Sequence, residues 1–317
     1  MAASVRADAG VRASVGAASG AGVRERVVRF GPGQSLAGIL SLPRAPRAGV
    51  PHVVFVNAGI IHRVGPNRLY VDLARALAAL GYPVLRFDLS GLGDSEAIAG
   101  GASLAESAVA DIQTALDYLA GTRKATHFVV FGLCSGANYS MLAAFADARV
   151  MGTMLIDPTV TRTPRSRRVH LVRRLRNPAT WGALLTLRHP VWQRSLGRLR
   201  SSVAVAQAAT AQSGQRAQAE VRGPAEAEVR ASLEALIGRG AHLMFVFTGG
   251  VNHVYNYRDQ LFDLLPGLDF RQQLRLEFMP ETDHTVSDGP GRAQLVASVG
   301  EWITRSFPGD PRPEDDA

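Results

Sequence analysis

The amino-acid sequence predicts an α/β fold with a mostly parallel central sheet, helices on both faces and an inserted helical cap. Short aliphatic runs alternate with segments of helical periodicity over most of the chain. Turns rich in glycine follow several of these runs. Between Asp157 and Gly240 the alternation is interrupted by about 80 residues without a strand pattern, far more than an ordinary connection needs.

Composition places this fold in one domain. The chain has 317 residues, of which 46% are hydrophobic and 20% charged, enough for one sizeable core. Residues 1–24 and 308–317 lack a periodic apolar face, so we expect a disordered N-terminal arm and a disordered tail. We find neither the apolar run of a signal peptide nor the roughly 18 apolar residues of a spanning helix. We therefore expect a soluble, cytoplasmic protein.

The predicted elements follow in a regular order. Residues 27–30 and 36–42 flank turn-forming residues and predict a hairpin that opens the domain. Further strands are predicted at residues 53–56, 83–87, 128–131, 150–156, 243–247 and 273–278. Helices are predicted at residues 69–80, 104–119, 135–145 and 293–303. Because parallel neighbours need a crossover, each helix supplies the connection between two strands. The core is therefore predicted to comprise residues 25–157 and 241–307.

The predicted cap, residues 158–240, carries most of the positive charge. Its segment 161–200 holds eleven Arg and no Asp or Glu, with large apolar residues such as Trp181 and Trp192 interleaved. The net charge of +8 is thus gathered in one segment instead of spread over a face, which favours a local anion site over nucleic-acid binding.

The strongest chemical signal is an aliphatic strand that runs into two glycines flanking Cys134. Gly132 and Gly136 have the spacing of a nucleophile elbow, in which a strained residue joins a strand to a helix. The helix start lowers a thiol pKa and presents backbone N–H groups to a developing oxyanion. We therefore predict Cys134 as the nucleophile, against the alternative of an ordinary buried thiol. Ser135 would be the nucleophile only in an elbow shifted by one residue; its backbone N–H is a predicted oxyanion donor.

A thiolate nucleophile needs a histidine, and His284 follows the last predicted strand at the open end of the sheet. An exposed loop histidine is the alternative interpretation. The residue that orients this imidazole is predicted to be Asn252, in the turn after the preceding strand, because a thiolate–imidazolium pair can work with an asparagine. Asp157, at the end of the strand after the elbow helix, is the alternative acid.

The loop after the first parallel strand should supply a second oxyanion donor, for which we select Gly59. His62 and Arg63 follow and either line the pocket or belong to a solvated loop. A second glycine-rich loop, at Gly91 and Gly93, lacks the features of a phosphate or dinucleotide loop, so no cofactor is predicted; Asp88 and Asp94 are expected to brace it. A chain with one cysteine has no disulfide or cysteine-rich metal site, and no metal is predicted.

Together these residues resemble the α/β-hydrolase superfamily, and within it the serine aminopeptidase-like and exosortase A system-associated hydrolases of bacteria. The resemblance spans residues 27–307, and its most telling motifs are Arg63 to Arg68, Leu85 to Asp88, Gly91 to Ser95, Gly132 to Gly136, Tyr255 to Tyr257 and Asp283 to Thr285. It implies a mobile cap between the sixth and seventh core strands and a nucleophile, acid and histidine in that chain order.

The sequence departs from this family pattern in two places. Cysteine stands where serine is usual, and asparagine where a carboxylate is usual. Dienelactone hydrolases and polyhydroxyalkanoate synthases look similar in placing cysteine at the elbow, so the first departure does not imply inactivity. Both departures weaken the expectation of plain esterase activity.

These observations favour an acyl hydrolase or acyltransferase that acts on an ester or thioester, such as a coenzyme A or acyl-carrier-protein thioester, through an acyl-cysteine intermediate. Guanidinium groups of the cap fit phosphate oxygens or the acidic face of a carrier protein. The same cap suits peripheral contact with an anionic membrane. The alternative is a catalytically silent ligand-binding protein on the same fold. The sequence identifies neither the acyl group nor its acceptor.

Overall fold

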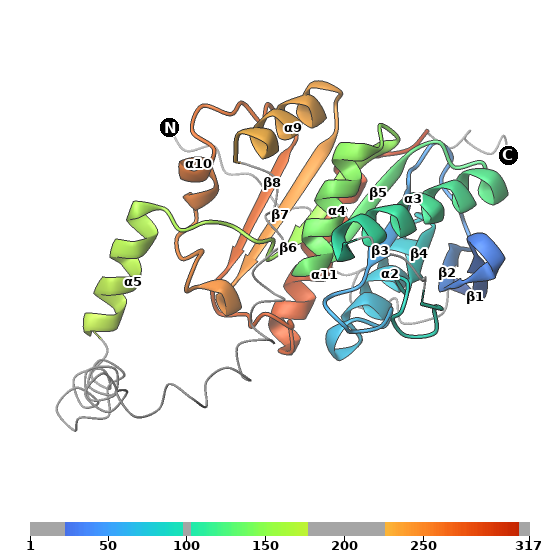
Figure 1. Ribbon diagram of the computed structural model, residues 1–317, viewed down its shortest axis with the longest axis horizontal. Coiled ribbons are helices and arrows are strands. Elements are labelled where there is room, and N and C mark those ends of the chain that lie inside the picture. Colours follow the sequence, from blue (N-terminus) through green and yellow to red (C-terminus); the bar gives the residue numbers. More distant parts are fainter. Residues whose placement is uncertain (1–22, 98–102, 177–225, 311–317) are drawn as a thin grey trace, which may run out of the picture.

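The computed structural model describes residues 23–97, 103–176 and 226–310. Within these ranges the chain forms one twisted sheet with helices on both sides. Helix α5 (Pro164–Arg176) lies apart from the sheet (Figure 1). The predicted arm, the tail and the middle of the predicted cap lie outside the described residues.

The sheet in the described part of the chain has eight strands in the order β1-β2-β4-β3-β5-β6-β7-β8. The strands are β1 (Val23–Phe30), β2 (Leu36–Pro43), β3 (His52–Val56), β4 (Val84–Phe87), β5 (Phe128–Leu133), β6 (Val150–Ile156), β7 (His242–Thr248) and β8 (Leu274–Met279). β2 pairs antiparallel with both β1 and β4, and the remaining pairs are parallel. The carboxyl ends of β3 to β8 therefore meet at one edge, where the βα loops gather.

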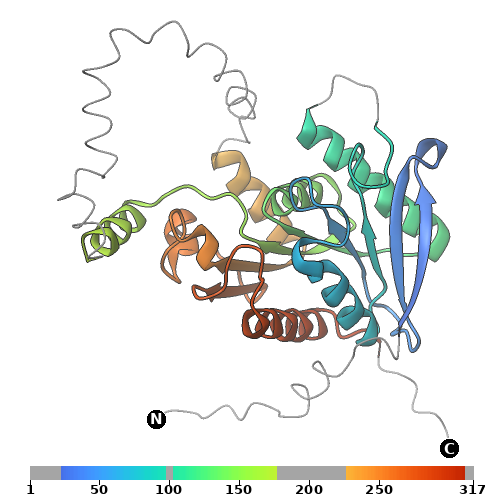
Figure 2. The ribbon, with the colours of Figure 1, turned by 90° about the horizontal axis from the view of Figure 1, so that it is seen from below.

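Two layers of helices bury the two faces of this sheet (Figure 2). On one face, α3 (Leu104–Arg123), α4 (Ser135–Ala146) and α9 (Glu226–Gly238) contribute to a core cluster that includes Leu116, Ala144 and Leu236. On the other face lie α2 (Leu69–Ala79) and α11 (Gly289–Ser306). Because β5 lies inside the sheet and all of its residues are buried, it reads as a continuous apolar run without alternation.

The predicted fold class and element order are confirmed. The hairpin forms as β1 and β2 around the short helix η1 (Pro32–Gln34), and each predicted strand and helix occurs within a few residues of its expected bounds. β1 begins earlier than predicted because its exposed positions, such as Arg24 and Arg26, give no apolar signal. α3 continues beyond its apolar periodicity to Arg123, where Lys124 adopts a left-handed conformation that ends the helix.

The described part of the predicted cap contains two helices with different surroundings. α9 packs against α4 and buries Leu233, Leu236 and Ile237 in the core. α5 instead is mostly exposed beyond Ser166. Between β7 and β8 lie two short helices, η3 (Gly249–Val251) and α10 (Gln260–Leu264), and η2 (Pro66–Arg68) leads into α2.

Candidate active site

Cys134 lies at the sharp turn between β5 and α4. Its backbone has φ 58° and ψ −119°, a strained conformation for a residue with a side chain. A Cβ atom on Gly132 would overlap the Gly136 carbonyl group, and one on Gly136 would overlap the carbonyl oxygen of Asn57. The two glycines thus permit the close backbone packing that holds the turn, and the Cys134 side chain is left exposed to solvent.

Tyr70 supports this turn from beneath, a role that the sequence did not reveal. Its buried hydroxyl donates to the carbonyl oxygen of Val56 at 3.0 Å and accepts a hydrogen bond from the N–H of Leu133 at 3.2 Å. One side chain from α2 therefore ties the end of β3 to the end of β5. The link fixes the loop after β3 relative to Cys134.

His284 and Asp157 form a hydrogen-bonded pair at the same edge of the sheet. The distance between His284 Nδ1 and Asp157 Oδ2 is 2.7 Å. The Asp157 side chain is fully buried and also accepts hydrogen bonds from the backbone N–H and the hydroxyl of Thr248, at 2.7 and 2.6 Å. A Cβ on Gly250 would overlap His284, so a glycine at this turn allows the histidine loop to approach. The carboxylate is held on both sides and fixes the orientation of the imidazole.

The ionisation of Cys134 and His284 is coupled. A hydrogen bond with His284 lowers the pKa of the Cys134 thiol, against the opposing effect of burial. The hydrogen bonds with Asp157 and then Cys134 raise the pKa of His284 to about 10, again against burial. Both shifts are in the direction of a thiolate beside an imidazolium, and a thiolate is the reactive form of a cysteine nucleophile.

In the structure Asp157, the alternative acid, hydrogen-bonds to His284, whereas Asn252, the orienting residue predicted first, does not. Asn252 is exposed, its backbone N–H donates to the carbonyl of Gly249, and its side chain makes no hydrogen bond within the described residues. It lies beyond the helical turn η3, whereas Asp157 directly follows β6, the strand beside the elbow strand. Asp157 has φ 47°, and this left-handed conformation accompanies its turn into the site. The sequence signal was its position immediately after a strand.

The two predicted oxyanion donors lie at the elbow. The N–H of Gly59 donates to the Ser135 hydroxyl oxygen at 2.9 Å, which places the loop after β3 against the start of α4. A hydrogen bond from the backbone of Ser135 contributes to the lowered pKa of Cys134. The Ser135 hydroxyl therefore accepts the hydrogen bond of the Gly59 N–H.

The predicted bracing by Asp88 and Asp94 is confirmed, and Arg63 is its centre. Arg63 pairs with the buried carboxylate of Asp88 and, at 2.5 Å, with Asp94. Asp88 also accepts from the backbone N–H of Arg63 at 2.6 Å and from Asn57 Nδ2 at 3.2 Å. Asn57 in turn accepts from the N–H of Leu89 at 2.8 Å. These contacts join the loop after β3, which carries Gly59, to the loop after β4.

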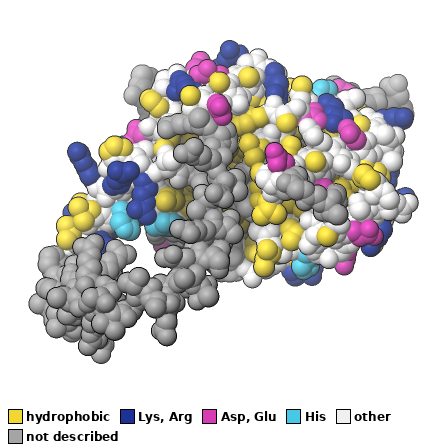
Figure 3. Space-filling view, viewed as in Figure 1, with side chains coloured by type: hydrophobic (Ala, Val, Ile, Leu, Met, Phe, Trp, Pro, Cys, Tyr) yellow, Lys and Arg dark blue, Asp and Glu magenta, His cyan; other side chains and the backbone are white. Residues whose placement is uncertain are grey.

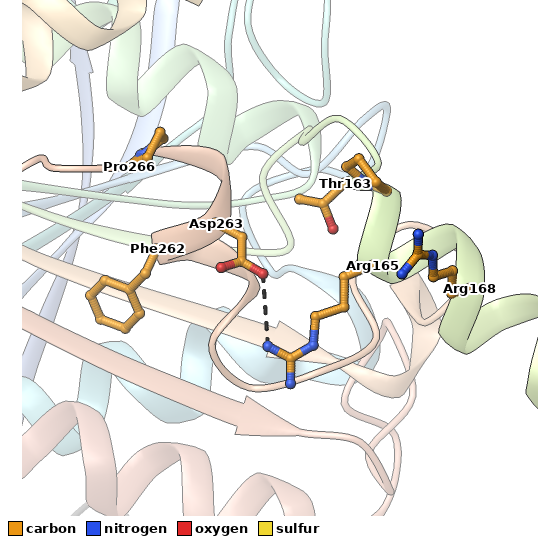
Figure 4. Close-up of a pocket in the computed structure, with 7 residues that line it drawn as sticks. Thr163, Arg165, Arg168, Phe262, Asp263 and Pro266 are labelled. Carbon is orange, nitrogen blue, oxygen red and sulfur yellow. Dashed lines mark ion pairs between the residues drawn. The ribbon is translucent and has the colours of Figure 1, made fainter.

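An open hollow of about 510 Å³ lies apart from the residues of this triad, between the start of α5 and α10 (Figure 4). Arg165 crosses it, at 3.8 Å from Asp263 and with its guanidinium 4.4 Å from the centre of the Tyr257 ring. The lining residues are Thr163, Pro164, Arg165, Arg168, Phe262, Asp263 and Pro266.

The described residues contain neither a metal-binding cluster nor a membrane-spanning helix. In residues 23–97, 103–176 and 226–310, no group of three His, Cys, Asp or Glu side chains is arranged to hold a metal ion. Within the same described residues, no helix combines the length and apolar content required to cross a membrane.

The sequence matches a known family over more than half of its length. The model of the family described as serine aminopeptidase, S33, matches residues 52–232, which include the elbow and Asp157. No curated protein matches the sequence.

Solved α/β hydrolases share the fold at low sequence identity. An α/β serine hydrolase of Xanthomonas campestris, described as lacking a lid, is 17% identical, with a TM-score of 0.51 over 92% of this chain and 98% of its own. A Pyrococcus furiosus esterase is 13% identical, with a TM-score of 0.55 over 89% and 91%. Proline iminopeptidase of Mycobacterium smegmatis is 15% identical, with a TM-score of 0.52 over 89% and 98%.

Proposed function

Because the chain belongs to the serine aminopeptidase S33 family of α/β hydrolases, we propose that it is an acyl hydrolase or acyltransferase acting on an ester or thioester through an acyl-Cys134 intermediate. The observation that carries this proposal is the arrangement of Cys134 at the elbow, with a lowered thiol pKa and with His284 held by the buried Asp157. These are the parts of a nucleophile, base and orienting acid.

The proposed reaction has two halves. The Cys134 thiolate attacks the carbonyl carbon of the substrate, and the C=O electron pair moves onto the oxygen to give a tetrahedral oxyanion. As the carbonyl re-forms, the bond to the leaving alcohol or thiol breaks, and the imidazolium of His284 supplies its proton. A water molecule or another acceptor then loses a proton to His284, attacks the acyl group and releases the Cys134 thiolate.

Asp157 and the backbone donors serve this cycle without bonding to the substrate covalently. The Asp157 carboxylate keeps the His284 imidazole oriented and stabilises its protonated form, through the 2.7 Å hydrogen bond. The N–H groups of Gly59 and Ser135 are proposed to stabilise the oxyanion. For Gly59 this requires the substrate oxygen to replace the Ser135 hydroxyl as acceptor.

An apolar rim beside the proposed oxyanion site supports an acyl substrate. Ile60, the residue after Gly59, is 87% exposed, and Ile61 is also exposed. Solvent-exposed isoleucines next to a nucleophile offer apolar surface to an acyl chain. A thioester acyl-enzyme reacts readily with amines and thiols, so transfer competes with hydrolysis where water is excluded. The proposed donors include coenzyme A and acyl-carrier-protein thioesters.

The alternative of a silent binding protein loses its main support. It rested on the lack of a carboxylate at the position of Asn252. Asp157 supplies a carboxylate to His284 from a different strand, so the departure at Asn252 does not remove the orienting acid. The cysteine in place of serine remains the departure that an experiment must address.

The proposal is tested by trapping the intermediate. Wild type and Cys134→Ala are incubated with a short-chain acyl thioester and with an activated aryl ester. The reactions are quenched in acid, and the mass of each intact protein is measured by mass spectrometry. An adduct that is labile to hydroxylamine and confined to wild type supports acylation of Cys134. Loss of the acyl group to water or to an added amine then separates hydrolysis from transfer. An adduct on both proteins moves the role to Ser135. If neither is acylated and Cys134 also resists alkylation, the enzyme proposal fails.

A further inference from the structure

Helix α5 is anchored to the body of the protein along one face. The side chain of Ser166 is buried, and its carbonyl oxygen accepts a hydrogen bond from Asn256 Nδ2 at 2.9 Å. One helical turn earlier, the Thr163 hydroxyl lies 2.7 Å from the hydroxyl of Tyr257. Two turns after Ser166, Arg173 donates to the backbone carbonyl of Asn256 at 3.1 Å. The helix is therefore held in a defined orientation relative to β7 and the loop that follows it.

The opposite face of α5 carries an apolar stripe that is open to solvent. Leu171, Val172 and Leu175 are 57%, 46% and 48% exposed. Leu175 is four residues from Leu171 and three from Val172, so the three side chains lie on one side of the helix. Ser166 and Arg173, which contact the body of the protein, lie on the opposite side of the helix. The stripe therefore faces away from the hydrophobic core.

Arginines border the apolar stripe and no acidic residue offsets them within the helix. Arg167 and Arg168 are exposed and lie one turn before Leu171 and Val172, and Arg176 follows the stripe. Figure 3 shows basic and hydrophobic side chains gathered over the region of α5. In sequence, the absence of Asp and Glu extends from residue 161 to residue 200. Long arginine stems can lie along an apolar surface while their guanidinium groups reach outward.

We propose that this face of α5, defined by Arg167, Arg168, Leu171, Val172 and Leu175, docks the protein on the surface of an anionic lipid bilayer. A short helix with an apolar stripe between arginines can lie in the interface, with the leucines among the acyl chains and the arginines at lipid phosphates. The charge complementarity favours a negatively charged surface, and a bilayer also accepts the outward apolar stripe. The inference does not depend on catalysis by Cys134.

The docking face lies close in sequence to the site. Only residues 158–163 separate Asp157 from the first residue of α5. The proposed site and the docking face are therefore joined by a segment of six residues. Amphiphilic acyl donors partition into such membranes, which would bring them to the proposed site.

The test measures co-sedimentation of the full chain with vesicles of phosphatidylglycerol and phosphatidylcholine, and with vesicles of phosphatidylcholine alone. All variants carry Cys134→Ala, so binding is measured without turnover and failure of the enzyme proposal leaves this result interpretable. We expect preferential binding to the anionic vesicles that weakens as salt increases. Arg167→Gln with Arg168→Gln, and separately Leu171→Ser with Val172→Ser, should each weaken binding at least about tenfold.

Matched controls use equivalent residues away from α5. Leu104→Ser changes a leucine that is 78% exposed at the start of α3, and Arg26→Gln with Arg305→Gln removes two exposed arginines. We expect these controls to bind vesicles nearly as wild type does. If these controls lose binding to the same extent as the α5 variants, binding does not depend on α5 and the proposal is overturned.

Two other outcomes also contradict it. Equal binding to neutral and anionic vesicles, or no binding, removes the bilayer as the partner. An acidic acyl carrier protein that binds through the same residues, while vesicles do not bind, assigns the face to a protein partner instead. A lowered melting temperature of Leu171→Ser with Val172→Ser, without vesicle binding by wild type, would show that the chain itself covers the stripe.

Discussion

At the scale of single residues, the chemistry depends on where charge is held. Asp157 is buried with Thr248 on one side and His284 on the other, so its carboxylate cannot turn away from the imidazole. The resulting hydrogen bond raises the pKa of His284, and the His284 hydrogen bond lowers that of Cys134. The imidazole that lowers the thiol pKa is therefore held by a carboxylate that solvent does not reach.

The first prediction separates the two orienting candidates. Asp157→Asn should lower the rate of Cys134 acylation on the order of 10²-fold or more, because the protonated imidazole loses its anionic partner. Asn252→Ala should change the rate by less than about twofold, since the side chain is exposed and makes no hydrogen bond within the described ranges. Stopped-flow acylation with an activated ester measures both. A large loss of acylation rate in Asn252→Ala, with a small loss in Asp157→Asn, would assign the orienting role to Asn252.

The second prediction concerns the hydroxyl of Ser135, which occupies the Gly59 N–H. Ser135→Ala keeps the backbone N–H of residue 135 but removes the acceptor that a substrate oxygen must displace. A hydrogen bond contributes about 0.5–1.5 kcal/mol, so acylation should accelerate by up to about tenfold. The measurement is kcat/KM with the same activated ester. Slower acylation would instead indicate that the hydroxyl donates to the oxyanion.

At the scale of elements, the elbow is formed by a strand, a helix and a neighbouring loop whose backbones pack in close contact. β5 enters the turn and α4 leaves it, and the loop after β3 is pressed against Gly136. The Arg63–Asp88 ion pair and the Tyr70 hydroxyl hold that loop from two other directions. The position of Gly59 thus depends on contacts with the loop after β4 and with α2, as well as on the sequence of its own loop.

A prediction at this scale compares two glycines. Gly132→Ala places a Cβ against the Gly136 carbonyl, and relief requires movement of the backbone at the turn. It should lower the free energy of unfolding by about 3 kcal/mol or more. Gly121→Ala, in α3, meets nothing within 4 Å and should be neutral or stabilising by up to about 1 kcal/mol. Chemical denaturation measures both, and similar effects of the two changes would contradict the tight turn.

At the scale of the whole molecule, the pKa values of Cys134 and His284 depend on three parts of the chain that are distant in sequence. Cys134, Asp157 and His284 follow different strands, and only the parallel sheet brings their ends to one edge. Since Cys134 is the one cysteine of the sequence, its reactivity reports directly on this assembly.

The pH dependence of alkylation tests that dependence on folding. The pKa of Cys134 is lowered in the folded protein, so thiolate persists below the ordinary value of 9.0 and the rise of the alkylation rate with pH should be centred below it. Unfolding in guanidinium chloride should move that centre upward toward 9.0, because the hydrogen bond with His284 is lost. His284→Ala should shift the folded protein in the same direction. A profile unchanged by unfolding would contradict a perturbed thiol.

The sequence alone was sufficient to predict the α/β fold, the order of its elements and the positions of Cys134, His284 and Gly59. These predictions rest on local patterns: buried parallel strands read as apolar runs, and an elbow requires glycines at fixed spacing. The roles of Arg63 and Tyr70 could not be predicted in this way, because they depend on contacts with Asp88 and Leu133, which are distant in the chain.

Only the tertiary structure decided which residue orients His284. Local sequence offers both Asn252, which it favours, and Asp157, since both follow strands at the correct edge. The choice depends on strand order and on the backbone direction at each strand end: β6 lies next to β5, and Asp157 turns into the site, while η3 leaves Asn252 exposed. The proposed nucleophile and base could thus be predicted from local pattern, whereas the carboxylate that contacts His284 is set by packing between segments that are far apart in sequence.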